Sequence, residues 1–159
     1  MFFQKKEFLI ALSFLSWVFL INSECIADNS GSPVDVILQI QKSYIEANVP
    51  DQKNFDAFLN RDLRNFFSKK ISATVSIEYS LLREGSTQSG TGYPKFYLWV
   101  KIFDKGSRVD EGAVRITAIE KTHFVVTDFI DKQQIKKNPQ RIKMVFPAAL
   151  YDSIIERVK

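Results

Sequence analysis

Side chains that bind transition metals or form disulfides are almost absent from this chain of 159 residues. Cys25 is its only cysteine and His123 its only histidine. Zinc sites usually need several cysteine or histidine ligands, and one cysteine cannot close an intrachain disulfide. We therefore expect no metal, no cofactor and no thiol nucleophile, and a fold that is stabilised by packing.

Motifs for catalysis and for phosphate binding are also missing. The segment 83–92, REGSTQSGTG, lacks the G-x-x-x-x-G-K signature and the strand-to-helix unit of a phosphate-binding loop. There is no Ser-His-Asp set, and the one candidate general base, Asp128, has Arg115 as its expected ion-pair partner. These absences favour a non-catalytic protein, and the lack of a basic-aromatic run argues against a nucleic-acid partner.

The one long hydrophobic run lies at the N-terminus. Two lysines precede a stretch over residues 8–21 that is interrupted only by two serines. A membrane-spanning helix needs about 20 apolar residues, so this shorter stretch is typical of a secretory signal peptide. Small residues at positions 25 and 27 predict cleavage after residue 27, which leaves residues 28–159 as a single periplasmic or secreted domain. An uncleaved anchor is the alternative, and Glu24 argues against a lipoprotein signal.

Positive charge is concentrated at the C-terminal end. The chain carries a formal net charge of +4, and residues 28–130 hold equal numbers of basic and acidic side chains. Residues 131–159 hold seven basic and three acidic ones, so this basic tail carries the whole surplus. We expect either a solvated helical surface or a docking site for an anionic membrane or an acidic partner. The candidate residues are Lys132, Lys136, Lys137, Arg141 and Lys143.

Two helices are predicted before residue 70. The first has Ser32 as its N-cap and Pro33 at its first position, and it ends near Asn48. The second carries a helical stripe of phenylalanines and leucines over residues 55–67, with a break expected near Asn60.

Residues 71–83 fit two structures. Apolar residues at positions 75, 77, 79 and 81 alternate with polar ones as in a strand, but a helix that continues from Phe67 also accommodates the pattern. The sequence leaves this choice open.

Three strands are predicted next, over residues 96–103, 112–120 and 123–130. The segment DKGSRVD (104–110) and a tight turn at residues 121–122 join them, and such short connections predict an antiparallel meander. The chain then returns to short helices, whose last apolar stripe is Leu150, Ile154 and Val158. The expected fold is α+β, with N-terminal helices packed on a curved antiparallel β-meander and a C-terminal helical tail.

A two-residue turn at Lys121-Thr122 sets the expected register, in which Ile116 faces Thr127 and Arg115 faces Asp128. The sheet then has two different faces. The aliphatic face, which we expect both N-terminal helices to cover, comprises Phe96, Leu98, Val100, Ile102, Val114, Ile116 and Ala118. The mixed face comprises Tyr97, Trp99, Lys101, Phe103, Arg115, Thr117 and Asp128.

The mixed face is the candidate ligand-binding site. Trp99 is the only tryptophan after residue 27, and the predicted Arg115–Asp128 pair lies beside it. An aromatic floor with one paired charge can orient a ligand in a pocket or groove, so the candidate site is Tyr97, Trp99, Arg115, Thr117 and Asp128. A plain sheet surface and a homodimer contact are the alternatives. So large an apolar patch is rarely left bare on a soluble monomer, so we expect a ligand, a partner or the chain itself to cover it.

The element order, with the segments FYLWVKIF and GAVRITAIEKTHFVVTDFI followed by short helices, resembles small exported domains of the cystatin-like and nuclear-transport-factor-two-like superfamily. The resemblance spans about residues 33–131 and implies a sheet curled around a long helix, often with a conical pocket. Catalytic members place an Asp, His or Tyr inside the cone, where Asp128, Tyr97 and Trp99 match, whereas His123 falls at a turn. The tail after residue 133 is longer than this fold requires and is able to cap the sheet.

These observations favour an exported, non-catalytic binding domain for a small apolar ligand, a lipid or an envelope protein. An inhibitor or immunity-type protein that acts on a partner enzyme is the alternative. A pocket binder should retain a small molecule, whereas an inhibitor should present a flat or protruding patch to a protein.

Overall fold

A computed structural model describes residues 32–89 and 91–159. The predicted signal peptide and its cleavage site lie outside these residues. Residues 33–159 form one compact unit, and every residue of both hydrophobic cores belongs to it. None of the described helices has both the length and the apolar character that crossing a membrane requires.

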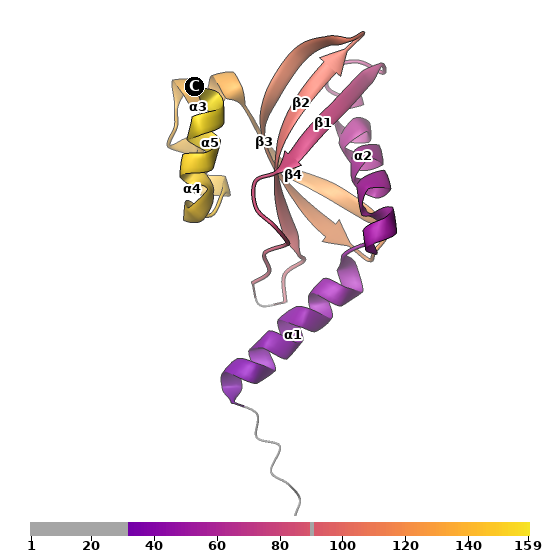
Figure 1. The fold of residues 1–159 in the computed structure, drawn as a ribbon, viewed down its shortest axis with the longest axis vertical. Coiled ribbons are helices and arrows are strands. Elements are labelled where there is room, and N and C mark those ends of the chain that lie inside the picture. Colours follow the sequence, from indigo (N-terminus) through magenta and orange to yellow (C-terminus); the bar gives the residue numbers. More distant parts are fainter. Residues whose placement is uncertain (1–31, 90) are drawn as a thin grey trace, which may run out of the picture. The chain divides into compact units, whose positions relative to one another are not determined.

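The fold is α+β, as the sequence predicted, and it has three layers (Figure 1). A helix layer precedes a four-stranded antiparallel sheet of order β1-β2-β3-β4, and a second helix layer follows it. The elements are α1 (Pro33–Asn48), α2 (Gln52–Ser68), β1 (Val75–Leu81), β2 (Lys95–Asp104), β3 (Ser107–Ile119), β4 (His123–Asp131), α3 (Lys132–Lys137), α4 (Arg141–Val145), the 3-10 turn η1 (Ala148–Leu150) and α5 (Tyr151–Val158). Helix α2 lies on one side of the sheet, and α3 to α5 lie on the other.

The first hydrophobic core fills the space between α2 and the sheet. Leu59, Leu63 and Phe67 of α2 are fully buried against the aliphatic face. All seven strand residues that the sequence assigned to this face belong to the core, which confirms the prediction. Because such buried side chains contribute about 1.5–3 kcal/mol each, this core is a major source of stability. Helix α2 also runs through Asn60 without the expected break, and the Asn60 side-chain amide donates to the backbone carbonyl of Asp56 at 2.9 Å.

Helix α1 belongs to neither core, so the prediction that both N-terminal helices cover the sheet is wrong for α1. Its start at Pro33 and its end at Asn48 are as predicted. Asn48 is its only buried residue. The Asn48 side-chain oxygen accepts the Glu120 N–H at 3.0 Å, and its backbone carbonyl accepts the Lys121 N–H at 2.9 Å. The end of α1 is therefore fastened to the turn between β3 and β4.

That turn differs from the predicted one and displaces the nearby register. Glu120 and Lys121 have φ angles of 50° and 58°, the left-handed values that both central residues of a type I′ turn need. The connection has three residues rather than two, so Ile116 faces Val126 instead of Thr127. A bulge at Thr127 then restores the predicted pairing of Arg115 with Asp128.

Two further segments of the sheet are defined by the strand pairing. Residues 75–81 form a strand, β1, which pairs with β2 along its whole length. The predicted connection 104–110 is wrong, because Lys105 and Gly106 alone make the turn and the strands extend to Asp104 and Ser107. Gly106 has a φ of 82°, which glycine adopts without steric cost.

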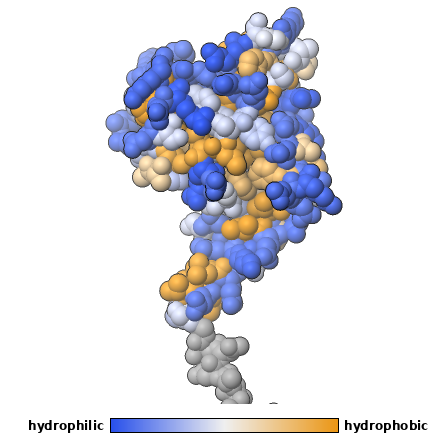
Figure 2. Space-filling model, viewed as in Figure 1, coloured by the Kyte–Doolittle hydropathy of each residue, from blue (hydrophilic) through white to orange (hydrophobic). Residues whose placement is uncertain are grey.

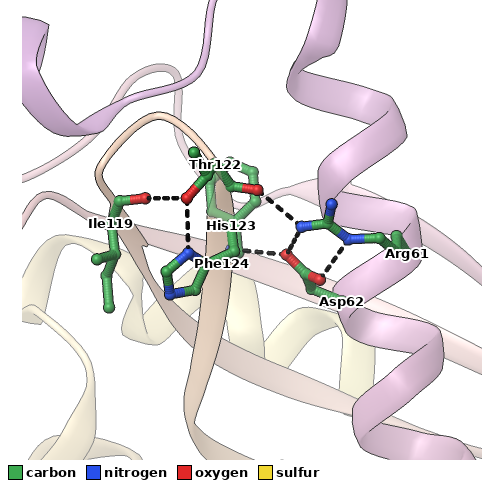
Figure 3. Close-up of polar contacts among 6 residues, drawn as sticks. All are labelled: Arg61, Asp62, Ile119, Thr122, His123 and Phe124. Atoms are coloured by element: carbon green, nitrogen blue, oxygen red, sulfur yellow. Dashed lines mark hydrogen bonds and ion pairs between the residues drawn. The ribbon is translucent and has the colours of Figure 1, made fainter.

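A polar junction joins α2 to the start of β4 (Figure 3). The Arg61 guanidinium donates to the Asp62 carboxylate at 2.8 Å and to the Thr122 carbonyl at 2.7 Å. The other Asp62 oxygen accepts the backbone N–H of Phe124 at 2.7 Å. Since β4 is an edge strand, this contact occupies a backbone donor that would otherwise be open to another strand.

Candidate functional site

The five candidate residues do share one face of the sheet, but the C-terminal tail covers that face. Tyr97 and Trp99 are only 4% and 3% exposed, and Thr117 is buried as well. They belong to or adjoin a second hydrophobic core that the tail builds on the sheet. The core residues are Leu82, Tyr97, Trp99, Ala113, Ile130, Ile135, Ile142, Phe146, Leu150, Ile154 and Val158. The chain itself therefore covers the aromatic patch, and the predicted stripe of Leu150, Ile154 and Val158 is part of the cover.

Arg115 and Asp128 form the predicted ion pair, and the pair holds the tail in place. The Arg115 Nε donates to the Asp128 carboxylate at 2.7 Å. A second guanidinium nitrogen of Arg115 donates to the Val145 carbonyl of α4 at 3.1 Å. Arg157 of α5 donates to the Ser80 hydroxyl of β1 at 2.8 Å. These hydrogen bonds give the charged residues of this face a structural role.

A small hollow remains where the covered face meets the edge of the sheet. Its lining residues are Glu78, Tyr79, Ser80, Trp99, Lys101 and Arg157. Its volume is about 120 Å³, well below the about 300–1,000 Å³ of ordinary small-molecule sites. The hollow can hold a few waters or a small ion, but it is too small for a lipid or an apolar ligand of drug size.

Ionisable groups in the N-terminal part of β3 interact with one another and with Lys132. Lys132, one of the five predicted basic-patch residues, pairs with Glu111 at 2.8 Å. Burial opposes the charged form of Glu111, but Lys132, Arg108 and a hydrogen bond from Trp99 outweigh it and lower the pKa of Glu111. Burial, with the charges of Asp131 and Glu111, raises the pKa of the neighbouring Asp110. Within residues 32–159 apart from 90, no group of His, Cys, Asp and Glu residues could hold a metal ion.

His123 is the first residue of β4, directly after the turn at which the sequence placed it, and it belongs to neither hydrophobic core. Its Nδ1 is 2.9 Å from the hydroxyl oxygen of Thr122 (Figure 3). Asp62, the carboxylate drawn in Figure 3, is occupied by Arg61 and by the backbone N–H of Phe124. Among the residues drawn in Figure 3, none forms a carboxylate–imidazole pair with His123.

Within the part of the chain that the structure describes, the largest group of exposed aliphatic side chains lies on α1. Five of them, between 44% and 61% exposed, are Val34, Val36, Ile37, Leu38 and Ile40. Figure 2 shows hydrophobic atoms on this helix that no other part of the described chain covers. The helical spacing of its apolar residues had predicted α1 to be a core helix. One available signal was that Val36 and Ile40 lie off the single stripe expected of such a helix.

The remaining four residues of the predicted basic patch are all exposed, on or between α3 and α4. They are Lys136, Lys137, Arg141 and Lys143. None of them forms an ion pair with the part of the chain that the structure describes. Lys137 and Arg141 also line an open hollow of about 480 Å³ together with Gln134 and Asn138. The positive surplus of the tail is thus presented to solvent, apart from Lys132.

Comparison with protein-family models, with curated proteins and with solved structures finds no match for this chain. The resemblance to the cystatin-like and nuclear-transport-factor-two-like superfamily therefore stays a prediction from the order of elements.

Proposed function

We propose that this chain is an exported, non-catalytic binding domain that binds a protein of the cell envelope through helix α1. The observation that supports this most is the exposure of five aliphatic side chains on one helix that contributes nothing to either core. Contiguous apolar surface of this kind on a soluble domain marks an interaction site.

The two filled faces of the sheet favour a protein partner over a small apolar ligand. The side chains of α2 occupy the first face, and those of α3 to α5 occupy the second. The hollow beside Trp99 is too small for a ligand of drug size. This filling of both faces favours binding through the outer surface, where protein partners are recognised.

The pattern on α1 fits recognition of a helix by a groove. Val34, Ile37 and Leu38 follow the i, i+3, i+4 spacing by which amphipathic helices insert into hydrophobic grooves of partner proteins. The described part of α1 carries two acidic residues, Asp35 and Glu46, and one basic residue, Lys42, which pairs with Glu46 at 3.8 Å. This slightly negative helix is not attracted to an anionic lipid surface, so an apolar protein groove is the better match.

Site-specific photocrosslinking in the native cell envelope tests the proposal. A photoreactive amino acid at Ile37 should give an adduct with one envelope protein, whereas the same group at Val109, which is exposed on β3, should not. The purified partner should then bind Ile37→Glu at least about tenfold more weakly than the wild type, while Val109→Glu binds normally.

Three results would refute this function. They are equal adducts at both positions, adducts with lipid alone, and an adduct of twice the chain mass, which would make α1 a homodimer contact. If the captured protein is an enzyme, its activity with and without the domain decides whether the domain acts as an inhibitor, the second function that a protruding helix favours.

A further inference from the structure

A second surface, separate from α1, combines free positive charge with one exposed apolar side chain. Met144 of α4 is 86% exposed, the highest value among the exposed large hydrophobic residues. Lys143 precedes it in the chain, and Arg141 lies one helical turn before it. We propose that this corner, formed by α3 and α4, docks on an anionic lipid bilayer, with Met144 inserted among the lipids.

The tail holds this corner rigidly. Ile142 and Phe146 are buried in the second core on either side of Met144, and the Val145 carbonyl accepts a hydrogen bond from Arg115. The buried neighbours fix which side of α4 points outward. Arg141 and Met144, three residues apart, are therefore presented to solvent on a short helix that the sheet supports.

The hollow beside this corner suits a phosphate-bearing headgroup. Lys137 and Arg141 line it with Gln134 and Asn138, and no carboxylate is among the lining residues. The Asn138 side-chain oxygen accepts the Gln140 N–H at 3.2 Å, which leaves the amide NH₂ as a donor. A guanidinium beside an ammonium and an amide donor is a good match for the charge and geometry of a lipid phosphate.

Charge and apolar exposure together favour a bilayer over an acidic protein. Lys136, Lys137, Arg141 and Lys143 have no ion pair within the described residues, so their charge is available to an anionic surface. A lone exposed methionine among basic residues gains little from a purely polar acidic surface. In the headgroup region of a bilayer, the same side chain leaves water while the basic groups stay with the phosphates.

A matched pair of charge variants tests the electrostatic part. Both are made in the domain 33–159, which contains every residue of both cores and excludes the hydrophobic N-terminal run. The corner variant is Lys137→Gln, Arg141→Gln and Lys143→Gln. The control variant removes the same charge from exposed positions on α2 and at its C-cap, by Lys53→Gln, Arg64→Gln and Lys69→Gln.

Binding is measured by co-sedimentation with vesicles of phosphatidylcholine alone and of phosphatidylcholine mixed with phosphatidylglycerol. Each basic residue near an anionic surface strengthens binding about fivefold, so the corner variant should bind mixed vesicles on the order of a hundredfold more weakly. The control variant should bind like the wild type. Neither the wild type nor the variants should bind strongly to vesicles of pure phosphatidylcholine. Salt should weaken binding to the mixed vesicles, since the electrostatic screening length falls to about 3 Å at 1 M.

Insertion of Met144 is tested independently with a fluorophore. The domain 33–159 has no cysteine, so Met144→Cys and, as a control, Lys53→Cys each provide one site for an environment-sensitive dye. Mixed vesicles should shift the emission to the blue at residue 144 and not at residue 53.

Equal binding by the two charge variants would overturn the proposal. So would charge-dependent binding without a shift at residue 144, which would mean that the domain only adheres to the charged surface and that Met144 is not inserted. Neither result bears on α1, so failure here is distinguishable from failure of the proposed function.

Discussion

Removing buried volume from α5 tests whether the tail is a true part of the core. Ile154 is 0% exposed and lies in the second core with Tyr97 and Trp99. Ile154→Ala deletes three buried carbon groups at about 0.8 kcal/mol each, which gives about 2.4 kcal/mol before any cavity is counted. With the cavity left beside the sheet, the loss should reach about 3–5 kcal/mol, in the upper part of the range for such substitutions, and Ile154→Val should cost about 0.5–1.5 kcal/mol.

Urea unfolding of the domain 33–159 measures these losses. A domain of this size has a free energy of unfolding of about 5–15 kcal/mol, so both variants should remain folded. Trp99 is the only tryptophan in this segment, and its fluorescence reports directly on the covered face. Val125→Ala, at a position exposed on β4, serves as the control and should cost less than about 0.5 kcal/mol.

The graded loss is what distinguishes a packed cover from a loosely attached tail. If Ile154→Ala costs no more than Val125→Ala, the tail is not packed as described, and the mixed face is open to a ligand. If the emission of Trp99 shifts to the red before the rest of the domain unfolds, the tail opens as a separate unit.

Three further predictions concern single residues. Asn48→Ala should lower the free energy of unfolding by about 1–3 kcal/mol, because it leaves the Glu120 N–H without the Asn48 side-chain acceptor. Urea unfolding measures this loss, with the exposed substitution Ser43→Ala as the control. Gly112→Ala should destabilise by about 1–3 kcal/mol or more, since a Cβ there would lie 2.3 Å from the Ile130 carbonyl oxygen, and an unchanged melting temperature would contradict this close approach. Burial and the hydrogen bond to Asp56 raise the pKa of Tyr79 above its usual value, so the folded state retains this proton more tightly than the unfolded chain. Stability should therefore fall as the pH rises above about 10, the pKa of tyrosine in an unfolded chain, and it should fall less in Tyr79→Phe.

The two faces of the sheet could be predicted from sequence because strand side chains alternate strictly. Placing Leu98 and Val100 on one face sends Trp99 to the other, whatever the exact register of the neighbouring strand. The register near residue 120 was not predictable in the same way. It depends on left-handed φ angles at Glu120 and Lys121, residue types that seldom adopt them, and on acceptors from Asn48, which is distant in the sequence.

The candidate site illustrates a different limit. An aromatic strand face with one ion pair looks the same in sequence whether it forms the floor of a pocket or the base of a second core. The deciding feature was the apolar stripe of Leu150, Ile154 and Val158, which buries itself on that face. When an apolar stripe of this kind lies in a tail that follows a sheet, the tail should first be expected to cover the sheet. Only the residues that the tail leaves exposed are then candidates for a binding surface.

The position of α1 outside both cores separates folding from binding in this domain. Its aliphatic residues contribute little to the free energy of unfolding, since only Asn48 of this helix is buried. Ile37→Ser and Leu38→Ser should therefore change the free energy of unfolding of the domain by no more than about 0.5 kcal/mol, as surface substitutions usually do. The same two substitutions should weaken binding of the envelope partner, because Ile37 and Leu38 are two of the proposed anchors. Calorimetry of the complex and urea unfolding of the free domain measure the two effects separately. A loss of stability similar to that of Ile154→Ala would show that α1 packs on its own domain, and the proposed binding surface would then be part of the fold.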